Sequence, residues 1–280
     1  TKVRGRKDLE SLSIPLIGEI PQYFNTKKKL GFSKKMQPDI KAIVVKEGNR
    51  NIINEAFRVL RSNMDFMANK DNKQNVFVIT SFNPGSGKSF LSMNIAMSFA
   101  IKKKRILVID GDLRHGSISS YVDSPQTGLS DYLGNRVDNY KDIIVEDKKY
   151  DNLHIIPIGT VPPNPTELLE NGKLAILIKV LGSEYDYIFI DCPPIDIVAD
   201  TQIIEKLADR TIFVIRSGLL DRSMLPELEC IYQEKRFKNL SVILNGTESA
   251  GGRYGYHYGY RYGYHNGYSS YYGNGNRDGK

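Results

Sequence analysis

The segment between residues 80 and 89 is a glycine-rich stretch whose residue types and spacing could bind phosphate. It reads TSFNPGSGKS and brings two glycines directly before a lysine and a serine. Glycines in this spacing let the backbone turn its N–H groups towards phosphate oxygens, and the N-terminus of a following helix adds a favourable dipole. The lysine would reach the β- and γ-phosphates, and the serine hydroxyl would bind Mg²⁺. The predicted nucleotide contacts are Pro84, Gly85, Ser86, Gly87, Lys88, Ser89 and Phe90.

One position departs from the general P-loop pattern. A P-loop has a glycine six residues before its lysine, and this chain has Phe82 there. A glycine-rich turn that binds no nucleotide is the alternative interpretation. Because the loop follows a predicted strand and opens a predicted helix, as the motif requires, we favour nucleotide binding.

Carboxylates follow two further apolar runs. Asp110 and Asp112 lie in the sequence DGDLR, and Asp191 begins DCPP. A single aspartate at a strand end is more often a turn or cap residue, but three beside a P-loop predict a metal and catalytic site. Asp191 has the position of a Walker B aspartate. The predicted metal ligands are Ser89, Asp110, Asp112 and Asp191, and the predicted catalytic residues are Lys88 and the same three aspartates.

The Asp110/Asp112 pair is more than phosphate binding requires, because a simple P-loop enzyme needs one carboxylate for Mg²⁺. A tyrosine hydroxyl has a pKa near 10, so its phosphorylation needs an acceptor for the proton. A carboxylate beside the γ-phosphate supplies one. We prefer Asp110, since it sits at the strand end closest to the expected γ-phosphate, and Asp112 remains the alternative.

The C-terminal stretch from residue 251 to 273 reads GGRYGYHYGYRYGYHNGYSSYYG. Glycine alternates with aromatic residues and aliphatic side chains are missing, so the segment cannot bury enough apolar surface to become ordered. We therefore predict a flexible, disordered tail that is either an adhesive surface or a set of targets for chemistry. Its nine tyrosines are Tyr254, Tyr256, Tyr258, Tyr260, Tyr262, Tyr264, Tyr268, Tyr271 and Tyr272.

Short apolar runs without alternation predict strands that are buried on both faces, as in a parallel sheet. Helix-length segments lie between them, so the fold class is α/β, a doubly wound and mainly parallel sheet. The predicted strands are Val76–Thr80, Ile106–Asp110, Leu153–Pro157, Tyr187–Asp191, Thr211–Ile215 and Ser241–Leu244. The predicted helices include Lys88–Ile101, Thr166–Leu181 and Ser223–Lys235.

The net charge of +7 is concentrated near the N-terminus, where residues 1–41 hold ten basic and four acidic residues. A solvated basic arm and a segment beside an anionic membrane surface both fit this charge. Nucleic acid is a third candidate partner, but no binding motif accompanies the charge. No apolar run approaches the roughly 18 residues needed to cross a bilayer. Two cysteines indicate a reducing compartment, and the four histidines lack metal-ligand spacing.

Together these motifs resemble the bacterial tyrosine kinases (BY-kinases), whose fold is that of the MinD/ParA-like P-loop ATPases and not that of eukaryotic protein kinases. The family combines a P-loop that lacks its first glycine, a DxD motif, a Walker B motif ending DxPP and a tyrosine-rich tail. The resemblance covers roughly residues 10 to 272. We expect a basic juxtamembrane-like segment over residues 1–45, a kinase domain over 46–248 and the tail over 249–280.

The resemblance also implies self-association. Glu55, Arg58 and Arg61 fit ExxRxxR, the motif with which the family forms rings, of which an octamer is one form that the resemblance suggests. An ordinary polar helix face with an i,i+3 ion pair is the alternative. An apolar face supports a helix here, and it comprises Ile53, Phe57, Leu60 and Met64.

Further implications rest on the resemblance alone. Residues 161–169 (VPPNPTELL) match a family loop, to which we assign a structural role with Thr166 as a helix N-cap, and Asn245 matches a position that contacts adenine. Residues 6–21 are similar to the segment that follows the second transmembrane helix of single-chain members, and the chain starts at Thr1 as a fragment of a longer polypeptide would. The implied location is the cytoplasmic face of the bacterial inner membrane. The implied role is capsular or extracellular polysaccharide synthesis and export, with a tyrosine phosphatase and synthesis proteins as partners and no nucleic acid.

We therefore expect Mg·ATP-dependent autophosphorylation of the tail, mostly in trans within a ring. A glycine-rich coil of about 30 residues spans roughly 30 Å, and nine phosphates would add on the order of −15 charges, which could drive a ring apart. One rival hypothesis is a MinD/ParA-like ATPase switch whose tail only binds a partner. Another is a tail that stacks on single-stranded nucleic acid, although it contains only four basic residues.

Overall fold

The computed structural model describes residues 1–23, 42–68, 75–195 and 199–248. Within these ranges one sheet of eight strands has the order β1-β8-β7-β2-β6-β3-β5-β4. Every neighbouring pair is parallel except β4 and β5. The strands are β1 (Leu16–Pro21), β2 (Val76–Thr80), β3 (Ile106–Asp110), β4 (Val145–Glu146), β5 (Leu153–Ile156), β6 (Tyr187–Asp191), β7 (Arg210–Arg216) and β8 (Leu240–Thr247).

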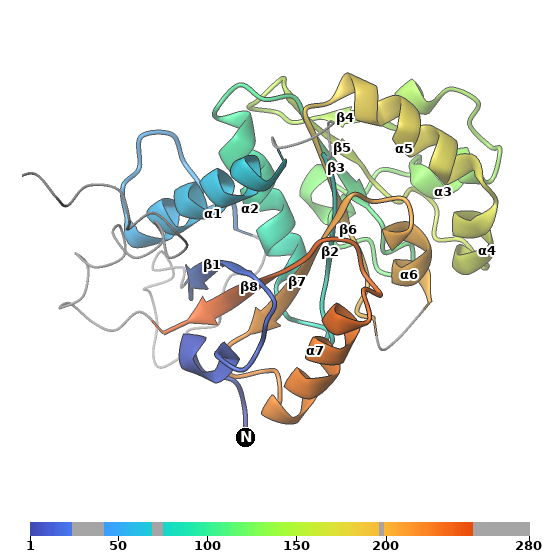
Figure 1. The fold of residues 1–280 in the computed structure, drawn as a ribbon. Helices are drawn as coiled ribbons and strands as arrows, with labels where there is room; N and C mark the ends of the chain where they lie inside the picture. The colour runs from blue at the N-terminus through green and yellow to red at the C-terminus, as the bar shows by residue number, and fades with distance from the viewer. Residues whose placement is uncertain (24–41, 69–74, 196–198, 249–280) are drawn as a thin grey trace, which may run out of the picture. The chain divides into compact units, whose positions relative to one another are not determined.

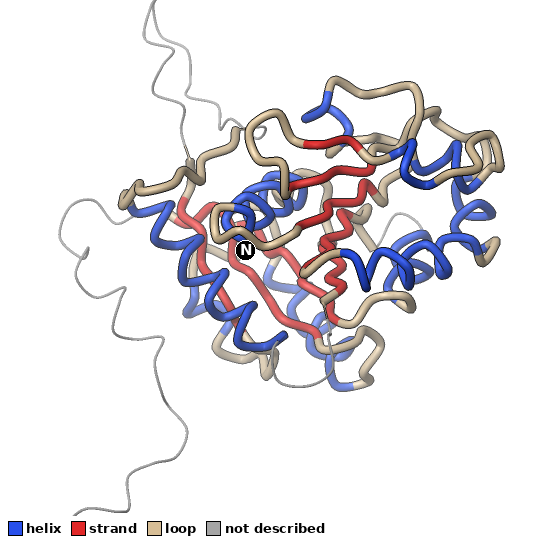
Figure 2. Tube along the Cα trace, turned by 90° about the horizontal axis from the view of Figure 1, so that it is seen from above, coloured by secondary structure: helices blue, strands red, loops and turns tan. Residues whose placement is uncertain are grey.

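Helices cover both faces of the sheet (Figures 1 and 2). The α-helices are α1 (Ile52–Ala68), α2 (Lys88–Ala100), α3 (Leu129–Leu133), α4 (Pro165–Glu170), α5 (Lys173–Glu184), α6 (Asp200–Glu205) and α7 (Leu225–Gln233). Short 3₁₀ helices span Arg6–Leu9, Ser119–Val122, Tyr140–Ile143 and Arg222–Met224.

Alternate residues of each strand pack against different helices. In β2, Phe77 and Ile79 lie in the core formed with α1 and α2, whereas Val76 and Val78 face α5 and α6 on the other side. Strands β7 and β8 direct their second face to α7. The strands in the middle of the sheet are therefore buried on both faces, which explains why β2, β3 and β6 read as unbroken apolar runs.

The predicted fold class is confirmed, and all six predicted strands are present. Two strands were not predicted. Strand β4 has only two residues, and β1 contains Gly18 and Pro21, which are uncommon in strands. Gly18 has a packing reason, because a Cβ there would lie 2.9 Å from Cδ1 of Leu60 on α1.

The predicted helix over Thr166–Leu181 is wrong as a single element. The structure divides it into α4 and α5. Gly172 lies between them with a φ of +82°, a left-handed conformation that interrupts a right-handed helix.

Residues Thr1–Glu248 form one compact unit. Strand β1 pairs in parallel with β8 inside that unit, so the start of the predicted juxtamembrane-like segment contributes to the sheet. The boundary at residue 45 stays a prediction, and the tail at 249–280, with its nine tyrosines, lies outside the described residues. No helix within the described ranges has the length and apolar character needed to cross a membrane.

Candidate active site

The three predicted motifs meet at one edge of the sheet because their strands are neighbours. Strand β6 lies between β2 and β3, and all three run in the same direction. Asp191 is therefore in register with both Ile79 and Asp110. The glycine-rich loop follows β2 and the DxD segment follows β3, so both lie at the carboxyl ends of the strands, where sheets of this kind bind ligands.

The glycine-rich loop has the backbone conformation that its glycines make possible. Gly85 and Gly87 have φ values of +74° and +93°, and Gly87 is the N-cap of α2. Inside the loop, the Ser81 and Ser86 hydroxyls each donate to the Asn83 carbonyl oxygen at 2.8 Å. The loop is thus a preformed turn that leads into the positive end of a helix dipole.

Phe82, the departure from the general P-loop pattern, has a structural explanation. Its side chain is buried and packs edge-on against Phe213 of β7, with 4.8 Å between the ring centroids. The residue anchors the start of the loop in the core on the α7 side of the sheet. The departure from the pattern therefore lies in the anchored start of the loop and outside residues 84–89.

Two side chains from the neighbouring strands hold the loop from outside. The Asn245 amide on β8 donates from Nδ2 to the Ser86 carbonyl oxygen at 3.0 Å, and Arg216 on β7 donates to the Gly85 carbonyl oxygen at 2.6 Å. Asn245 was predicted to contact adenine, and that stays a prediction. Arg216 was not predicted, although its position at the end of a buried strand was a signal.

We expect Gly87→Ala to disrupt this arrangement more than Gly85→Ala does. A Cβ at Gly87 would lie 2.2 Å from Nδ2 of Asn245, whereas one at Gly85 would meet no atom within 4 Å. Both changes strain a positive φ, which costs roughly 1 to 2 kcal/mol, but only Gly87→Ala also displaces the Asn245 bond. We expect it to lower the free energy of unfolding by about 2 to 4 kcal/mol.

Denaturant unfolding and nucleotide titration of both variants measure this difference. Nucleotide affinity should fall at least roughly tenfold for Gly87→Ala and much less for Gly85→Ala, since a displaced group at a binding site commonly costs that much. Equal losses in the two variants would contradict the role given to Asn245.

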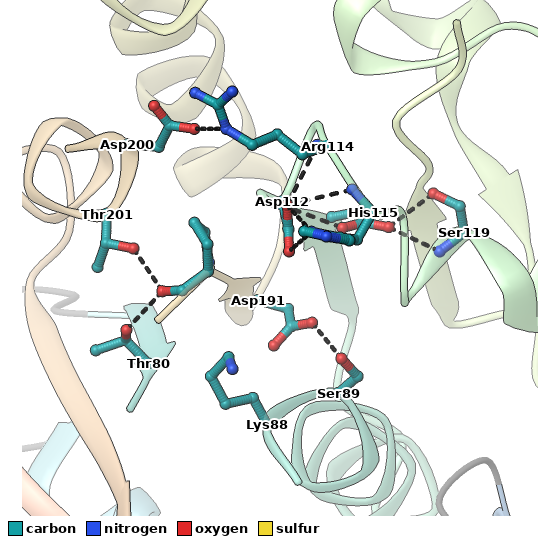
Figure 3. Close-up of polar contacts among 12 residues, drawn as sticks. Thr80, Lys88, Ser89, Asp112, Arg114, His115, Ser119, Asp191, Asp200 and Thr201 are labelled. Atoms are coloured by element: carbon teal, nitrogen blue, oxygen red, sulfur yellow. Dashed lines mark hydrogen bonds and ion pairs between the residues drawn. The ribbon is translucent and has the colours of Figure 1, made fainter. Parts of the chain in front are cut away.

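Asp191 connects the end of β6 to the start of α2 (Figure 3). Its Oδ2 accepts a bond from the Ser89 hydroxyl at 2.6 Å, and its side chain is buried. Burial raises the pKa of Asp191 to about 6, against the opposing effects of the Ser89 bond and the Lys88 charge. Burial also lowers the pKa of Lys88, and Asp191 and Asp112 partly offset this.

Asp110 is fully buried and faces Ser119. Its Oδ2 accepts bonds from the Ser119 backbone N–H at 2.8 Å and from the Ser119 hydroxyl at 2.7 Å. Burial, followed by the Asp191 charge, raises the pKa of Asp110 to about 7. A carboxylate whose pKa lies near the operating pH suits general-base work, but a phenol could reach it only if the segment that carries Ser119 moves.

The side chain of Asp112 is more open to solvent than that of Asp110. Its side chain is 13 % exposed and lies 3.1 Å from Nδ1 of His115, and its Oδ1 accepts the Arg114 backbone N–H at 3.2 Å. Figure 3 shows the carboxylates of Asp112 and Asp191 and the Lys88 ammonium facing the same space. The structure thus brings together all four predicted catalytic residues without choosing between Asp110 and Asp112 as base.

A network around the buried Asp200, beside this site, was not predicted from the sequence. Arg114 donates from Nε to Oδ2 of the buried Asp200 at 3.2 Å, and Thr166 donates to Oδ1 of Asp200 at 2.7 Å. The prediction that Thr166 caps a helix is wrong, because the N-cap of α4 is Asn164 and the Thr166 hydroxyl is used by Asp200. No local pattern indicated these partners, because they are far apart in the chain.

The raised pKa of Asp110 predicts how stability depends on pH in the nucleotide-free protein treated with a chelator. An acid with a higher pKa in the folded than in the unfolded state loses stability as pH rises between those two values. Here that window extends from about 4 to about 7. We expect Asp110→Asn to raise the free energy of unfolding by about 1 to 3 kcal/mol at pH 8 and by much less near pH 4.

Urea unfolding at the two pH values checks this expectation. The matched control is Asp123→Asn, whose carboxylate is 86 % exposed and pairs only with an exposed lysine, so its effect should stay within about 0.5 kcal/mol at both pH values. If the gain in the free energy of unfolding for Asp110→Asn did not change with pH, burial would not be what sets the pKa of this carboxyl group.

The residues of the site fit a metal that arrives with a nucleotide. Among the described residues, no group of three or more His, Cys, Asp or Glu side chains is arranged to hold a metal ion by itself. Mg²⁺ in a P-loop site needs fewer protein ligands, because one hydroxyl and one carboxylate are joined by phosphate oxygens and water in its coordination shell. Ser89 and Asp191 already lie in contact and provide the hydroxyl and the carboxylate.

The predicted oligomerisation residues lie away from this site, on α1. The expected apolar face is confirmed, since Ile53, Phe57, Leu60 and Met64 are buried. On the rest of the helix, Arg58 forms an ion pair with Glu55, and Arg61 donates to the Ser98 carbonyl oxygen of α2 at 2.9 Å. Both the intramolecular pair and a subunit contact are compatible with these positions, so the oligomerisation role stays a prediction.

Comparison with known proteins gives consistent matches. Residues 74–221 match a family described as an AAA domain. The tyrosine-protein kinase CpsD of Streptococcus agalactiae is 36% identical over 203 residues, which cover 72% of this chain and 85% of CpsD. The kinase domain of the Escherichia coli tyrosine kinase ETK has a TM-score of 0.74 and 26% identity, over 95% of this chain and 100% of that domain.

The septum site-determining protein MinD from Pyrococcus horikoshii, in its complex with Mg-ADP, is also similar. It has a TM-score of 0.51 and 25% identity, over 61% of this chain and 70% of MinD. The shared part of the fold therefore extends beyond kinases to P-loop ATPases.

Proposed function

Because this chain belongs to the bacterial tyrosine kinases, we propose that it is a Mg·ATP-dependent protein-tyrosine kinase that phosphorylates its own C-terminal tyrosine cluster. The observation that carries this proposal is the meeting of three carboxylates at the P-loop. Asp112 and Asp191 lie beside the P-loop lysine (Figure 3), and Asp110 is in register with Asp191 on the neighbouring strand. Nucleotide binding and hydrolysis need only one of them. The other two suit a reaction in which the acceptor must lose a proton.

In the proposed reaction a bond forms between the tyrosine oxygen and the γ-phosphorus of ATP, and the bond between that phosphorus and the β–γ bridging oxygen breaks. ADP leaves, and the phenolic proton passes to a carboxylate of the DxD pair. Lys88 and the loop N–H groups orient the phosphates, and Ser89 and Asp191 are the metal ligands, with help from Asp110 or Asp112. When bound, Mg²⁺ neutralises charge on the phosphate oxygens.

Asp110 is the preferred proton acceptor because its pKa of about 7 suits that role. Asp112 is the alternative because it is already exposed to an incoming group. The structure supports each for a different reason, so Asp110→Asn and Asp112→Asn should be compared at saturating Mg·ATP. The base is the residue whose loss removes the ascending limb of the pH–rate profile.

The wider role that we propose follows the family. Glu55, Arg58 and Arg61 would form contacts in a ring of subunits, in which one subunit phosphorylates the tail of another. The basic N-terminal residues would lie at the cytoplasmic face of the inner membrane, where each Lys or Arg adds about 1 kcal/mol of attraction to anionic lipid. The process would be polysaccharide synthesis and export, with a tyrosine phosphatase that resets the tail.

Assembly should depend on the phosphorylation state of the tail. Nine phosphates would add on the order of −15 charges, which exceeds the net charge of +7. We expect the phosphorylated protein to sediment as smaller species than the unphosphorylated protein at the same concentration, and more clearly at low salt. Identical sedimentation of the two forms would contradict a charge-driven switch.

One reaction with two measured products distinguishes a kinase from a MinD/ParA-like ATPase switch. Purified protein is incubated with Mg·ATP, released phosphate is quantified, and phosphotyrosine is located by mass spectrometry. The kinase predicts phosphotyrosine within residues 254–272. Phosphate release without phosphotyrosine would instead indicate a MinD/ParA-like ATPase switch, which the similarity to MinD favours as the second candidate.

A further inference from the structure

A basic pocket that is separate from the candidate active site lies between the N-terminal half of α1 and the C-terminal end of α2. Its volume is about 480 Å³, and none of the predicted catalytic residues lines it. Its cationic lining residues are Lys46, Arg50, Arg58, Arg61 and Lys102.

The charge of this pocket is positive and only partly compensated. Its lining holds five cationic side chains and two acidic ones, Glu47 and Glu55. Glu55 is already paired with Arg58. Among the described residues, no ion pair involves the other four cations, which are Lys46, Arg50, Arg61 and Lys102. The pocket is therefore suited to an anion.

Two buried asparagines hold the wall of the pocket in place. Asn54 accepts the Lys46 backbone N–H at 2.8 Å and donates to the Val44 carbonyl oxygen at 3.1 Å. Asn94 of α2 accepts the Val44 backbone N–H at 2.8 Å. Arg61 is fixed as well, by bonds to the carbonyl oxygen and the hydroxyl of Ser98. A pocket that is ordered in this way loses little entropy when a ligand binds.

The chemistry of the lining combines guanidinium groups with apolar surface. An arginine guanidinium group can donate two parallel hydrogen bonds to the oxygens of a phosphate group. Val45 and Ile101 add apolar surface that an aromatic ring could cover. A volume of several hundred Å³ is in the range of small-ligand sites. A phosphate attached to a phenyl ring satisfies all three features.

We infer that this pocket binds phosphotyrosine in a glycine-rich peptide, the form that the product of the proposed kinase would take. This inference rests on the proposed function for the origin of the ligand. It also connects the phosphotyrosine product to the assembly of subunits, because Arg58 and Arg61 line the pocket and belong to the predicted subunit contact. A bound phosphotyrosine and a neighbouring subunit would then compete for the same two arginines.

The test uses the 280-residue chain with Lys88→Met, so that no phosphotyrosine forms during the measurement. Synthetic peptides of residues 252–264 carry tyrosine, phosphotyrosine or phosphoserine at position 258 and a fluorescent label. We expect the phosphotyrosine peptide to bind roughly tenfold more tightly than either of the others, as expected for added charge-assisted bonds together with ring burial.

Variants then locate the binding site. Arg50→Ala with Lys102→Ala removes two cations from the lining, and neither belongs to the predicted subunit motif. Lys103→Ala with Lys104→Ala is the matched control, since both are exposed in the same turn and neither lines the pocket. We expect the first pair to weaken phosphotyrosine binding roughly tenfold and the control to change it less than about twofold.

Three outcomes would overturn the inference: no preference for the phosphorylated peptide, equal binding of phosphoserine and phosphotyrosine, or equal losses in the two double variants. Because the peptides are made chemically and the protein is inactive, none of these outcomes bears on whether the chain is a kinase. Conversely, if the wild-type protein makes no phosphotyrosine, the peptide titration still reports whether the pocket binds a phosphotyrosine peptide.

Discussion

Replacement of Lys88 by methionine is expected to lower phosphotyrosine formation at least about 100-fold while the protein stays folded. Removal of one preorganised charge that acts on a reacting group typically costs that much. The Lys88 ammonium is the cation between the phosphate loop and the carboxylates, and burial lowers its pKa while Asp191 and Asp112 raise it. Methionine is unbranched and only one atom shorter, so it removes the charge and the hydrogen-bond donors of Lys88 while it keeps most of the side-chain volume.

The measurement is quantitative detection of phosphotyrosine over time, together with thermal unfolding. The matched control is Lys103→Met, an exposed lysine just beyond the other end of α2, which should retain at least about half of the activity, as surface changes usually do. If Lys88→Met retained more than a tenth of the wild-type rate, the assignment of the P-loop as the phosphate site would have to be given up.

A chain that ends at Ser249 is expected to form no detectable phosphotyrosine and yet to bind Mg·ATP with an affinity within about twofold of that of the 280-residue chain, a difference well below 1 kcal/mol. The compact unit ends at Glu248 and contains the P-loop and all three carboxylates, so the binding machinery is retained. The nine clustered acceptors are lost.

Eight tyrosines remain in the shortened chain, and those with clear structural roles are poor acceptors. The Tyr187 hydroxyl donates to Asp65, and the Tyr185 hydroxyl lies 2.6 Å from Nδ1 of His154, with its pKa raised to about 12 by burial. A 280-residue variant with all nine tail tyrosines changed to phenylalanine separates loss of acceptors from loss of the tail. Persistent phosphotyrosine in either protein would place the acceptor elsewhere.

The local features of the sequence were enough to predict much of the site. A P-loop is continuous in sequence, and its glycines, lysine and serine act through one turn and one helix N-terminus. The carboxylates follow apolar runs that can only be strands in the middle of a parallel sheet, so their positions at one edge of the sheet also followed. The apolar face of α1 could be predicted in the same way, because its period of about 3.6 residues is local.

The tertiary structure decided which distant residues support these motifs. Phe82 packs against Phe213 of the neighbouring strand β7, Asn245 holds the P-loop from β8, and Arg114 meets a buried Asp200. None of these pairs has a local signature, because each depends on which strands become neighbours. The same applies to β1, whose Gly18 is explained only by the side chain of Leu60 packed against it.

The sequence by itself thus determined the chemistry that this protein can attempt, since reactive residue types and their local spacing are written directly in the chain. Only the tertiary structure decided the environment of each group. Burial raises the pKa of Asp110 to about 7 and that of Asp191 to about 6. The packing of α1 against α2 forms a basic pocket that is separate from the active site. Burial and charge proximity are sums over residues far apart in sequence, and folding is what brings those residues together.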